Sequence, residues 1–189
     1  MALAKSTFSD ASGFTLAEVI VSTAIFVTGI VALGQLFAMS TMSNRAARAT
    51  TSTMVLAQQK MEQLRGLAWG FDVLGLPLSD TTTDLTTSPP GTGGSGLSPS
   101  PPGTLTQNTA GFVDYLDQYG NWVGNGGSPP ANAVFIRRWS IEPLPTNPNN
   151  TLIFQVLVTP LRNRTDTTTS TRRLPDEARL VSVKTRKTI

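Results

Sequence analysis

Cysteine and histidine are both absent from the 189-residue chain, and charged residues make up only 14% of it. Without cysteine the chain forms no disulfide and has no thiolate nucleophile, and without histidine it has no imidazole base. Zinc sites built from these two residue types are excluded as well. An enzyme would therefore need paired carboxylates, a Ser/Lys dyad or a bound metal, and the sequence shows no such motif. We predict no catalytic residue, no metal ligand and no cofactor.

Charge is also balanced closely enough to leave the partner open. The net charge is +3, although the isoelectric point is about 9.7. So small an excess does not indicate a polyanionic partner. The length fits one domain with a modest core and an appended segment.

A long apolar run is what the sequence does have. No charged residue occurs between Val19 and Asn44, and about 20 such residues cross a hydrocarbon core of roughly 30 Å. Glu18 stands at the start of this predicted transmembrane helix, where a carboxylate is costly and needs a partner. Cleavage between Gly13 and Phe14 would create an α-ammonium four residues before Glu18, on the same helix face.

The stretch GFTLAEV (13–19) resembles the processing site of type IV prepilins and type II secretion pseudopilins. The resemblance implies that a prepilin peptidase cuts after Gly13 and that Phe14 becomes N-methylated. It also implies that Glu18 pairs with the N-terminus of an adjacent subunit and sets register in a filament. Ala17 departs from the pattern, because a larger aliphatic residue is usual before the glutamate.

These features predict four segments: a leader (1–13), a transmembrane and filament-core helix (14–43), an amphipathic helix of the head (44–66) and a β-rich head (67–189). The resemblance places the leader in the cytoplasm, the helix in the inner membrane and the head in the periplasm, with a cell-surface filament after assembly. Charge does not make this assignment, since Arg45 and Arg48 beyond the span outnumber Lys5 before it.

The helix is predicted to continue into the head along an apolar stripe. The stripe has helical spacing and consists of Met54, Ala57, Met61 and Leu64. Gly66 predicts the end of the helix, with Arg65 in the last turn, where a cation suits the helix dipole. An unbroken helix from Thr15 to Arg65 would be about 75 Å long.

The rest of the head reads as a loop followed by strands. Residues 77–109 are rich in Pro, Gly, Ser and Thr and predict a flexible, exposed loop. Alternating patterns then predict a hairpin at 111–124 with its turn at Asp117–Asn121, a strand pair at 133–144 and 151–161, and a strand at 178–185. The expected fold class is α+β and pilin-like, with the long N-terminal helix packed against a C-terminal antiparallel sheet. The strand with Arg-Arg-Trp resembles that of PilV-like minor pilins.

Two groups of charged residues in the head invite a ligand. Asp114 and Asp117 suggest calcium, but their spacing does not fit the EF-hand loop. Basic residues gather late in the chain, at Arg162, Arg164, Arg172, Arg173, Arg179, Lys184, Arg186 and Lys187. Nucleic acid is conceivable there, but no aromatic residue is interleaved with the cations. A solvated basic face is therefore favoured, without excluding nucleic acid.

The leading hypothesis is a minor type IV pilin, a non-enzymatic structural subunit incorporated into a pilus or its tip. The alternative is a minor pseudopilin of a type II secretion system; the 77–109 insertion and the Arg-Arg-Trp strand favour the pilus. A membrane-anchored periplasmic enzyme or an adhesive module represents a different class. The expected partners are the prepilin peptidase, other pilin or pseudopilin subunits through the N-terminal helix, and the inner membrane.

Overall fold

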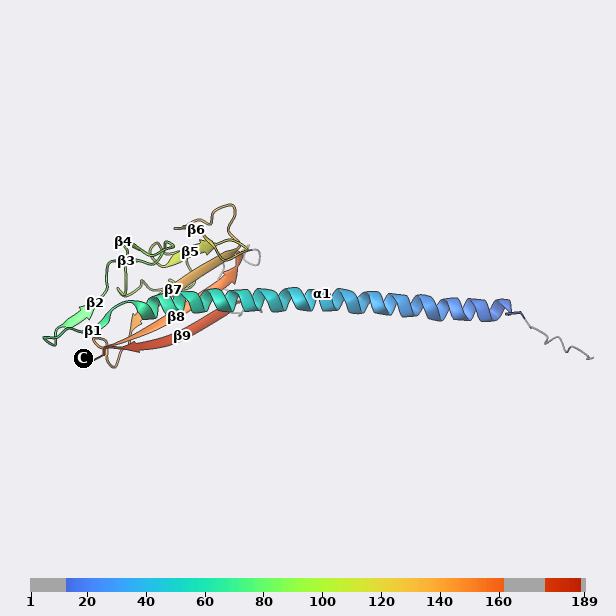
Figure 1. Ribbon diagram of the computed structural model, residues 1–189, viewed down its shortest axis with the longest axis horizontal. Helices are drawn as coiled ribbons and strands as arrows, with labels where there is room; N and C mark the ends of the chain where they lie inside the picture. The colour runs from blue at the N-terminus through green and yellow to red at the C-terminus, as the bar shows by residue number, and fades with distance from the viewer. Residues whose placement is uncertain (1–12, 162–175, 188–189) are drawn as a thin grey trace, which may run out of the picture. The chain divides into compact units, whose positions relative to one another are not determined.

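The structure is a computed structural model that describes residues 13–161 and 176–187. Within these residues, helix α1 (Leu16–Gly66) precedes nine strands: β1 (Trp69–Phe71), β2 (Pro77–Ser79), β3 (Thr83–Asp84), β4 (Gly91–Thr92), β5 (Val113–Leu116), β6 (Trp122–Asn125), β7 (Phe135–Pro143), β8 (Thr151–Pro160) and β9 (Ala178–Thr185). The last five form an antiparallel sheet in the order β6-β5-β7-β8-β9, and the C-terminal end of α1 runs along it (Figure 1). The expected α+β fold class is confirmed.

The chain divides into two compact units, Met1–Asn44 and Arg45–Ile189. The described part of the first unit is mainly helix, and its side chains are exposed throughout. This part of α1 is long and apolar enough to cross a membrane, judged by length and composition. Hydroxyl groups within it donate to the carbonyl four residues back, at Thr23, Thr28 and Thr41. The helix thus satisfies these polar groups internally, as a hydrocarbon environment requires.

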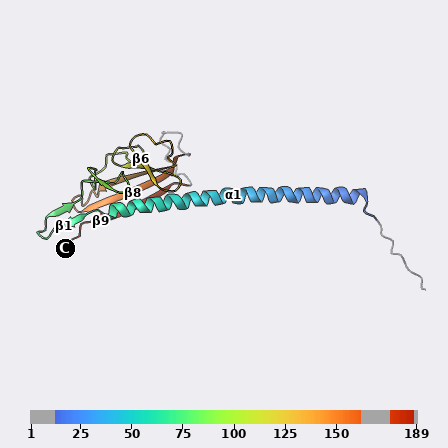
Figure 2. The ribbon, with the colours of Figure 1, turned by 45° about the horizontal axis from the view of Figure 1, so that its top comes forward.

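In the second unit, α1 lies along the sheet, as Figure 2 shows from a second direction, and it buries one face there. The buried residues recur every three or four positions: Thr53, Leu56, Ala57, Lys60, Met61 and Leu64. The predicted stripe is right for three of its four members, but Met54 is 40% exposed. Lys60 lies on the same buried face. The apolar stripe did not predict this, because a charged side chain does not contribute to an apolar pattern. The helix ends at Gly66, as predicted.

The sheet follows the alternating patterns of the sequence closely. On β8, the alternating residues Leu152, Phe154, Val156 and Val158 are all buried, and they form the core with Trp139 and Ile141 of the neighbouring β7. The predicted hairpin is present as β5 and β6, and Asp117 closes its turn through hydrogen bonds with Asn121. Strand β9 spans the predicted residues.

The expectation of exposed coil for residues 77–109 is wrong. The segment contains β2, β3 and β4, and it buries Leu85 and Leu97 in the core. Its turn-forming residues make a compact fold instead: a Cβ atom at Gly94 would lie 2.2 Å from the Cα of Asp84. Pro, Gly, Ser and Thr therefore reflect tight turns here rather than a lack of structure.

Candidate functional site

Gly13 and Phe14 lie immediately before α1, which begins at Leu16. Both residues are exposed, Phe14 at 87%. A Cβ atom at Gly13 would meet nothing within 4 Å, and Gly13 is not among the glycines with positive φ. The fold therefore gives no steric or conformational reason for a glycine at this position.

Glu18 has a partner within its own helix. One of its carboxylate oxygens, Oε2, accepts hydrogen bonds from the backbone N–H and the hydroxyl of Thr15, both at 2.9 Å. The N–H of Glu18 donates in return to the Thr15 hydroxyl at 3.3 Å. This reciprocal arrangement is a capping box, which satisfies two N–H groups left open at a helix start. The spacing Thr-x-x-Glu at 15–18 is the sequence signal that predicts this capping box.

Far from this end of α1, three charged side chains meet in the core of the head. Asp114 of β5 lies between Lys60 of α1 and Arg137 of β7, and all three are buried. The guanidinium of Arg137 binds both Asp114 oxygens, at 2.9 and 2.8 Å. The ammonium of Lys60 lies 2.9 Å from Oδ2 of Asp114. We call Lys60, Asp114 and Arg137 the buried charge cluster.

The buried charge cluster satisfies its remaining donors locally. Lys60 donates to the carbonyl of Leu85 at 2.6 Å and lies 4.4 Å from the ring centroid of Trp139. Arg137 also donates to the carbonyl of Leu56 at 3.2 Å. Burial lowers the pKa of Lys60 to about 8, while the charge of Asp114 acts in the opposite direction. The cluster joins helix, sheet and the 77–109 segment, so its geometry points to structure rather than chemistry.

The structure does not bring Asp114 and Asp117 together as ligands. Both oxygens of Asp114 are held by cations. The carboxylate of Asp117 instead accepts hydrogen bonds from Tyr119 and Asn121 in the hairpin turn. Among the described residues, no group of three acidic side chains could hold a metal ion.

The late basic residues are only partly described: Arg162, Arg164, Arg172 and Arg173 lie outside the described residues. Of the other four, Arg186 lies beside aromatic rings that are far from it in the sequence. The guanidinium of Arg186 lies 3.6 Å from the ring centroid of Trp69 and 5.8 Å from that of Phe71. In the folded head, therefore, aromatic rings do lie beside one of these cations, contrary to the expectation from the sequence.

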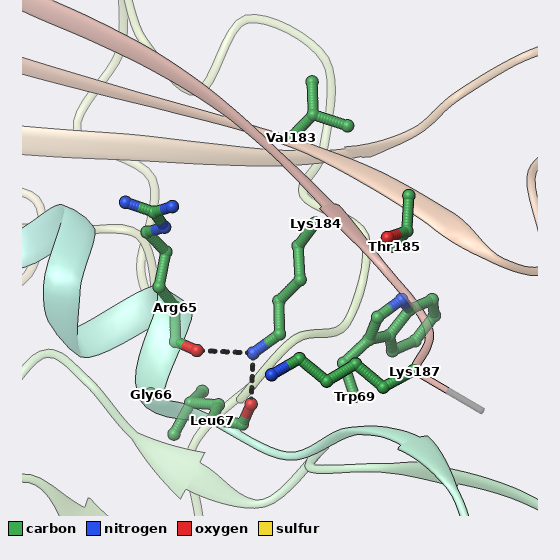
Figure 3. Close-up of a pocket in the computed structure, with 8 residues that line it drawn as sticks. All are labelled: Arg65, Gly66, Leu67, Trp69, Val183, Lys184, Thr185 and Lys187. Atoms are coloured by element: carbon green, nitrogen blue, oxygen red, sulfur yellow. Dashed lines mark hydrogen bonds between the residues drawn. The ribbon is translucent and has the colours of Figure 1, made fainter. Parts of the chain in front are cut away.

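A cavity of about 480 Å³ opens beside this contact. It is lined by Arg65, Gly66, Leu67, Trp69, Val183, Lys184, Thr185 and Lys187 (Figure 3). The ammonium of Lys184 donates to the carbonyls of Arg65, at 2.6 Å, and Leu67, at the C-terminal end of α1. Burial lowers the pKa of Lys184. The lysine thus caps the helix end and occupies one wall of the cavity.

Comparison of the chain with known protein families, curated proteins and solved structures found no match. The function is therefore argued from the residues themselves.

Proposed function

We propose that the protein is a minor type IV pilin. In this proposal a prepilin peptidase removes residues 1–13, Phe14 becomes the methylated N-terminus, and the apolar half of α1 holds the protein in the inner membrane until it enters a filament. The head remains on the periplasmic side. The subunit is structural and needs neither a catalytic residue nor a cofactor.

Gly13 is the observation that carries the proposal. Since the fold does not require glycine there, its presence directly before Phe14 is better explained by recognition from outside the chain. The position is open to such recognition, because both residues are exposed and precede the first helical turn. The exposed apolar helix that follows provides the membrane anchor.

Glu18 takes two successive partners in the proposal. Before assembly its carboxylate accepts from Thr15 in the capping box. In the filament the ammonium of a neighbouring Phe14 competes for the same oxygens, and the ionic contact is favoured because little water is present to screen it. The capping box keeps the carboxylate hydrogen-bonded until that neighbour arrives.

The first test replaces Gly13 with alanine in cells that make the filament. We expect Gly13→Ala to leave a longer, unprocessed protein in the membrane, detected by mass spectrometry of the intact chain. Gly29→Ala is the matched control, because a Cβ atom there also meets nothing within 4 Å. Normal processing of the Gly13→Ala variant would contradict the proposal.

The second test separates processing from assembly. Glu18→Ala leaves the Gly13–Phe14 bond unchanged, so we expect normal cleavage but little incorporation into purified filaments. Equal incorporation of this variant and the wild type would reject the role of Glu18. N-terminal mass spectrometry of the same filaments reports cleavage and methylation together.

A minor pseudopilin would share each of these features, so the filament itself has to distinguish the two. Purified surface pili containing the processed chain support the pilin. Loss of secreted enzymes on deletion of the gene, with pili unaffected, supports the pseudopilin instead.

A further inference from the structure

The hairpin of β1 and β2, residues 69–79, carries an apolar tip that is not covered by other described residues. The sequence at its end is VLGLPL (73–78), and each of these residues is exposed. Val73 and Leu74 reach 89% and 79% exposure. Large apolar side chains so fully exposed at a loop tip mark an interaction site more often than a neutral surface.

The tip is held in one conformation by hydrogen bonds within the hairpin turn. Asp72 Oδ1 accepts from the N–H groups of Leu74 and Leu76, at 2.9 and 2.7 Å. The backbone N–H of Asp72 donates to the carbonyl of Leu76, and Gly75 supplies the positive φ of the turn. Because these bonds fix the turn, Val73 and Leu74 do not fold back onto the head. A partner would therefore meet the apolar tip already formed.

Cations surround the base of the same hairpin. Arg186 donates to the carbonyls of Gly70 and Leu78, at 2.9 and 2.8 Å, and stacks on Trp69. Lys187 pairs with Gly70 through an isolated β-bridge. We call Arg65, Lys184, Arg186 and Lys187 the cationic collar; three of its members are cavity-lining residues beside Trp69 (Figure 3).

Three acidic residues lie near the cationic collar, and each is already engaged. Asp80, at the base of the hairpin, accepts hydrogen bonds from the N–H groups of Thr82 and Thr83. Glu62 lies 3.5 Å from Arg65, and Asp72 closes the turn of the hairpin. The four cations therefore exceed the nearby acids. An apolar tip, a tryptophan at its base and flanking Lys and Arg side chains match the layers of an anionic lipid surface in order: acyl chains, interface and phosphates.

We propose that the 69–79 hairpin docks onto an anionic lipid surface. Val73, Leu74 and Leu76 enter the acyl region, and the cationic collar meets the headgroup phosphates. An apolar groove of a protein would accommodate the tip but would not require the collar, so the lipid surface fits both features. The proposal concerns the head alone and is independent of processing at Gly13.

The first experiment measures binding of the full chain to added vesicles. The chain is held in nanodiscs of phosphatidylcholine, and flotation is followed with vesicles of phosphatidylcholine, with or without 30% phosphatidylglycerol. We expect binding to the anionic vesicles that weakens as salt rises. The double variant Val73→Ser/Leu74→Ser should bind about tenfold more weakly or worse, because it loses the two most exposed apolar side chains.

The matched control is Val55→Ser/Val181→Ser, on α1 and β9, where the two side chains are 58% and 61% exposed. It removes similar apolar surface away from the hairpin and should bind as the wild type does. A charge variant, Arg65→Gln/Lys187→Gln, should lose binding to the anionic vesicles only. Near-UV circular dichroism verifies that every variant keeps the wild-type fold.

A second measurement reports insertion directly. Because the chain has no cysteine, Leu74→Cys gives one labelling site for an environment-sensitive dye, and Val181→Cys gives a control site. We expect a blue shift at position 74 on adding anionic vesicles and none at position 181. Equal binding by wild type and Val73→Ser/Leu74→Ser, or an unshifted dye at position 74, would overturn the proposal.

Discussion

Asp114 is the residue on which the folding of the head most depends electrostatically. It is the one carboxylate within the buried charge cluster, shared by Lys60 and Arg137. Removing three charges from water is costly, and the attraction between them offsets that cost only while their geometry is complete. The three members therefore contribute unequally to stability. Loss of the carboxylate leaves two buried cations without a counter-charge, whereas loss of one cation leaves a complete ion pair.

This inequality gives a stability prediction. Asp114→Asn should lower the free energy of unfolding by about 3–5 kcal/mol, because two buried cations lose their anion. Lys60→Met should cost far less, since Arg137 still binds both oxygens of Asp114. Denaturation of the full chain in detergent, followed by near-UV circular dichroism, measures both. Equal losses in the two variants would show that the carboxylate is not the shared centre.

Lys60 also predicts how stability depends on pH. Burial lowers its pKa in the folded head to about 8, while an unfolded lysine titrates near 10.4. Between these values the unfolded chain binds the proton that the folded chain has released, so the free energy of unfolding rises with pH. For one group, the free energy of unfolding rises by at most about 1.4 kcal/mol per pH unit. Burial raises the pKa of Tyr115 in the folded head. Above about pH 10 the unfolded chain therefore loses this proton first, and Tyr115 makes the free energy of unfolding fall with pH.

Denaturation between pH 8 and 10 tests this dependence. The wild type should become more stable across the window, and Lys60→Met should lose most of that rise. A smaller rise remains expected in the variant, because burial also lowers the pKa of Lys184. Falling wild-type stability across the window would contradict the lowered pKa of Lys60.

At the scale of elements, the sequence predicted the helix end and the strands that a short-range residue pattern determines. Alternation identified β7, β8 and β9, and a single glycine identified the end of α1. The pattern failed where isolated residues anchor a segment: Leu85 and Leu97 stand among polar neighbours, so the 77–109 segment looked like a loop. Periodicity describes continuous faces and does not register single anchors.

The start of α1 offers a prediction about one turn of helix. Thr15→Val removes the hydroxyl that accepts from the N–H of Glu18 and donates to its carboxylate. We expect the first turn to lose about 0.5–2 kcal/mol of stability, the usual cost of losing an N-cap. Hydrogen exchange at the Glu18 amide in micelles measures the loss. Thr15→Ser keeps the hydroxyl and should preserve protection; equal protection in all three proteins would show that the cap is dispensable.

At the scale of the whole molecule, the candidate processing site and the long-range contacts of the head differ in how far the sequence could predict them. Gly13, Phe14 and Glu18 lie within six residues, so a linear motif identified them. The buried charge cluster joins positions 60, 114 and 137, and the contact of Arg186 with Trp69 joins positions even farther apart. Only the folded sheet brings such residues together, and no local pattern encodes their distance.

The division into two units predicts that the head folds without the membrane half of α1. The core cluster begins at Leu56 on the helix, and residues 13–44 contribute no buried side chain. A variant comprising residues 45–189 should therefore keep the near-UV circular dichroism of the full chain and unfold cooperatively. A variant comprising residues 62–189 loses Leu56, Ala57, Lys60 and Met61 from the core and should not fold. If the longer variant also failed to fold, the membrane half would contribute to the stability of the head, and the two units could not be treated as independent.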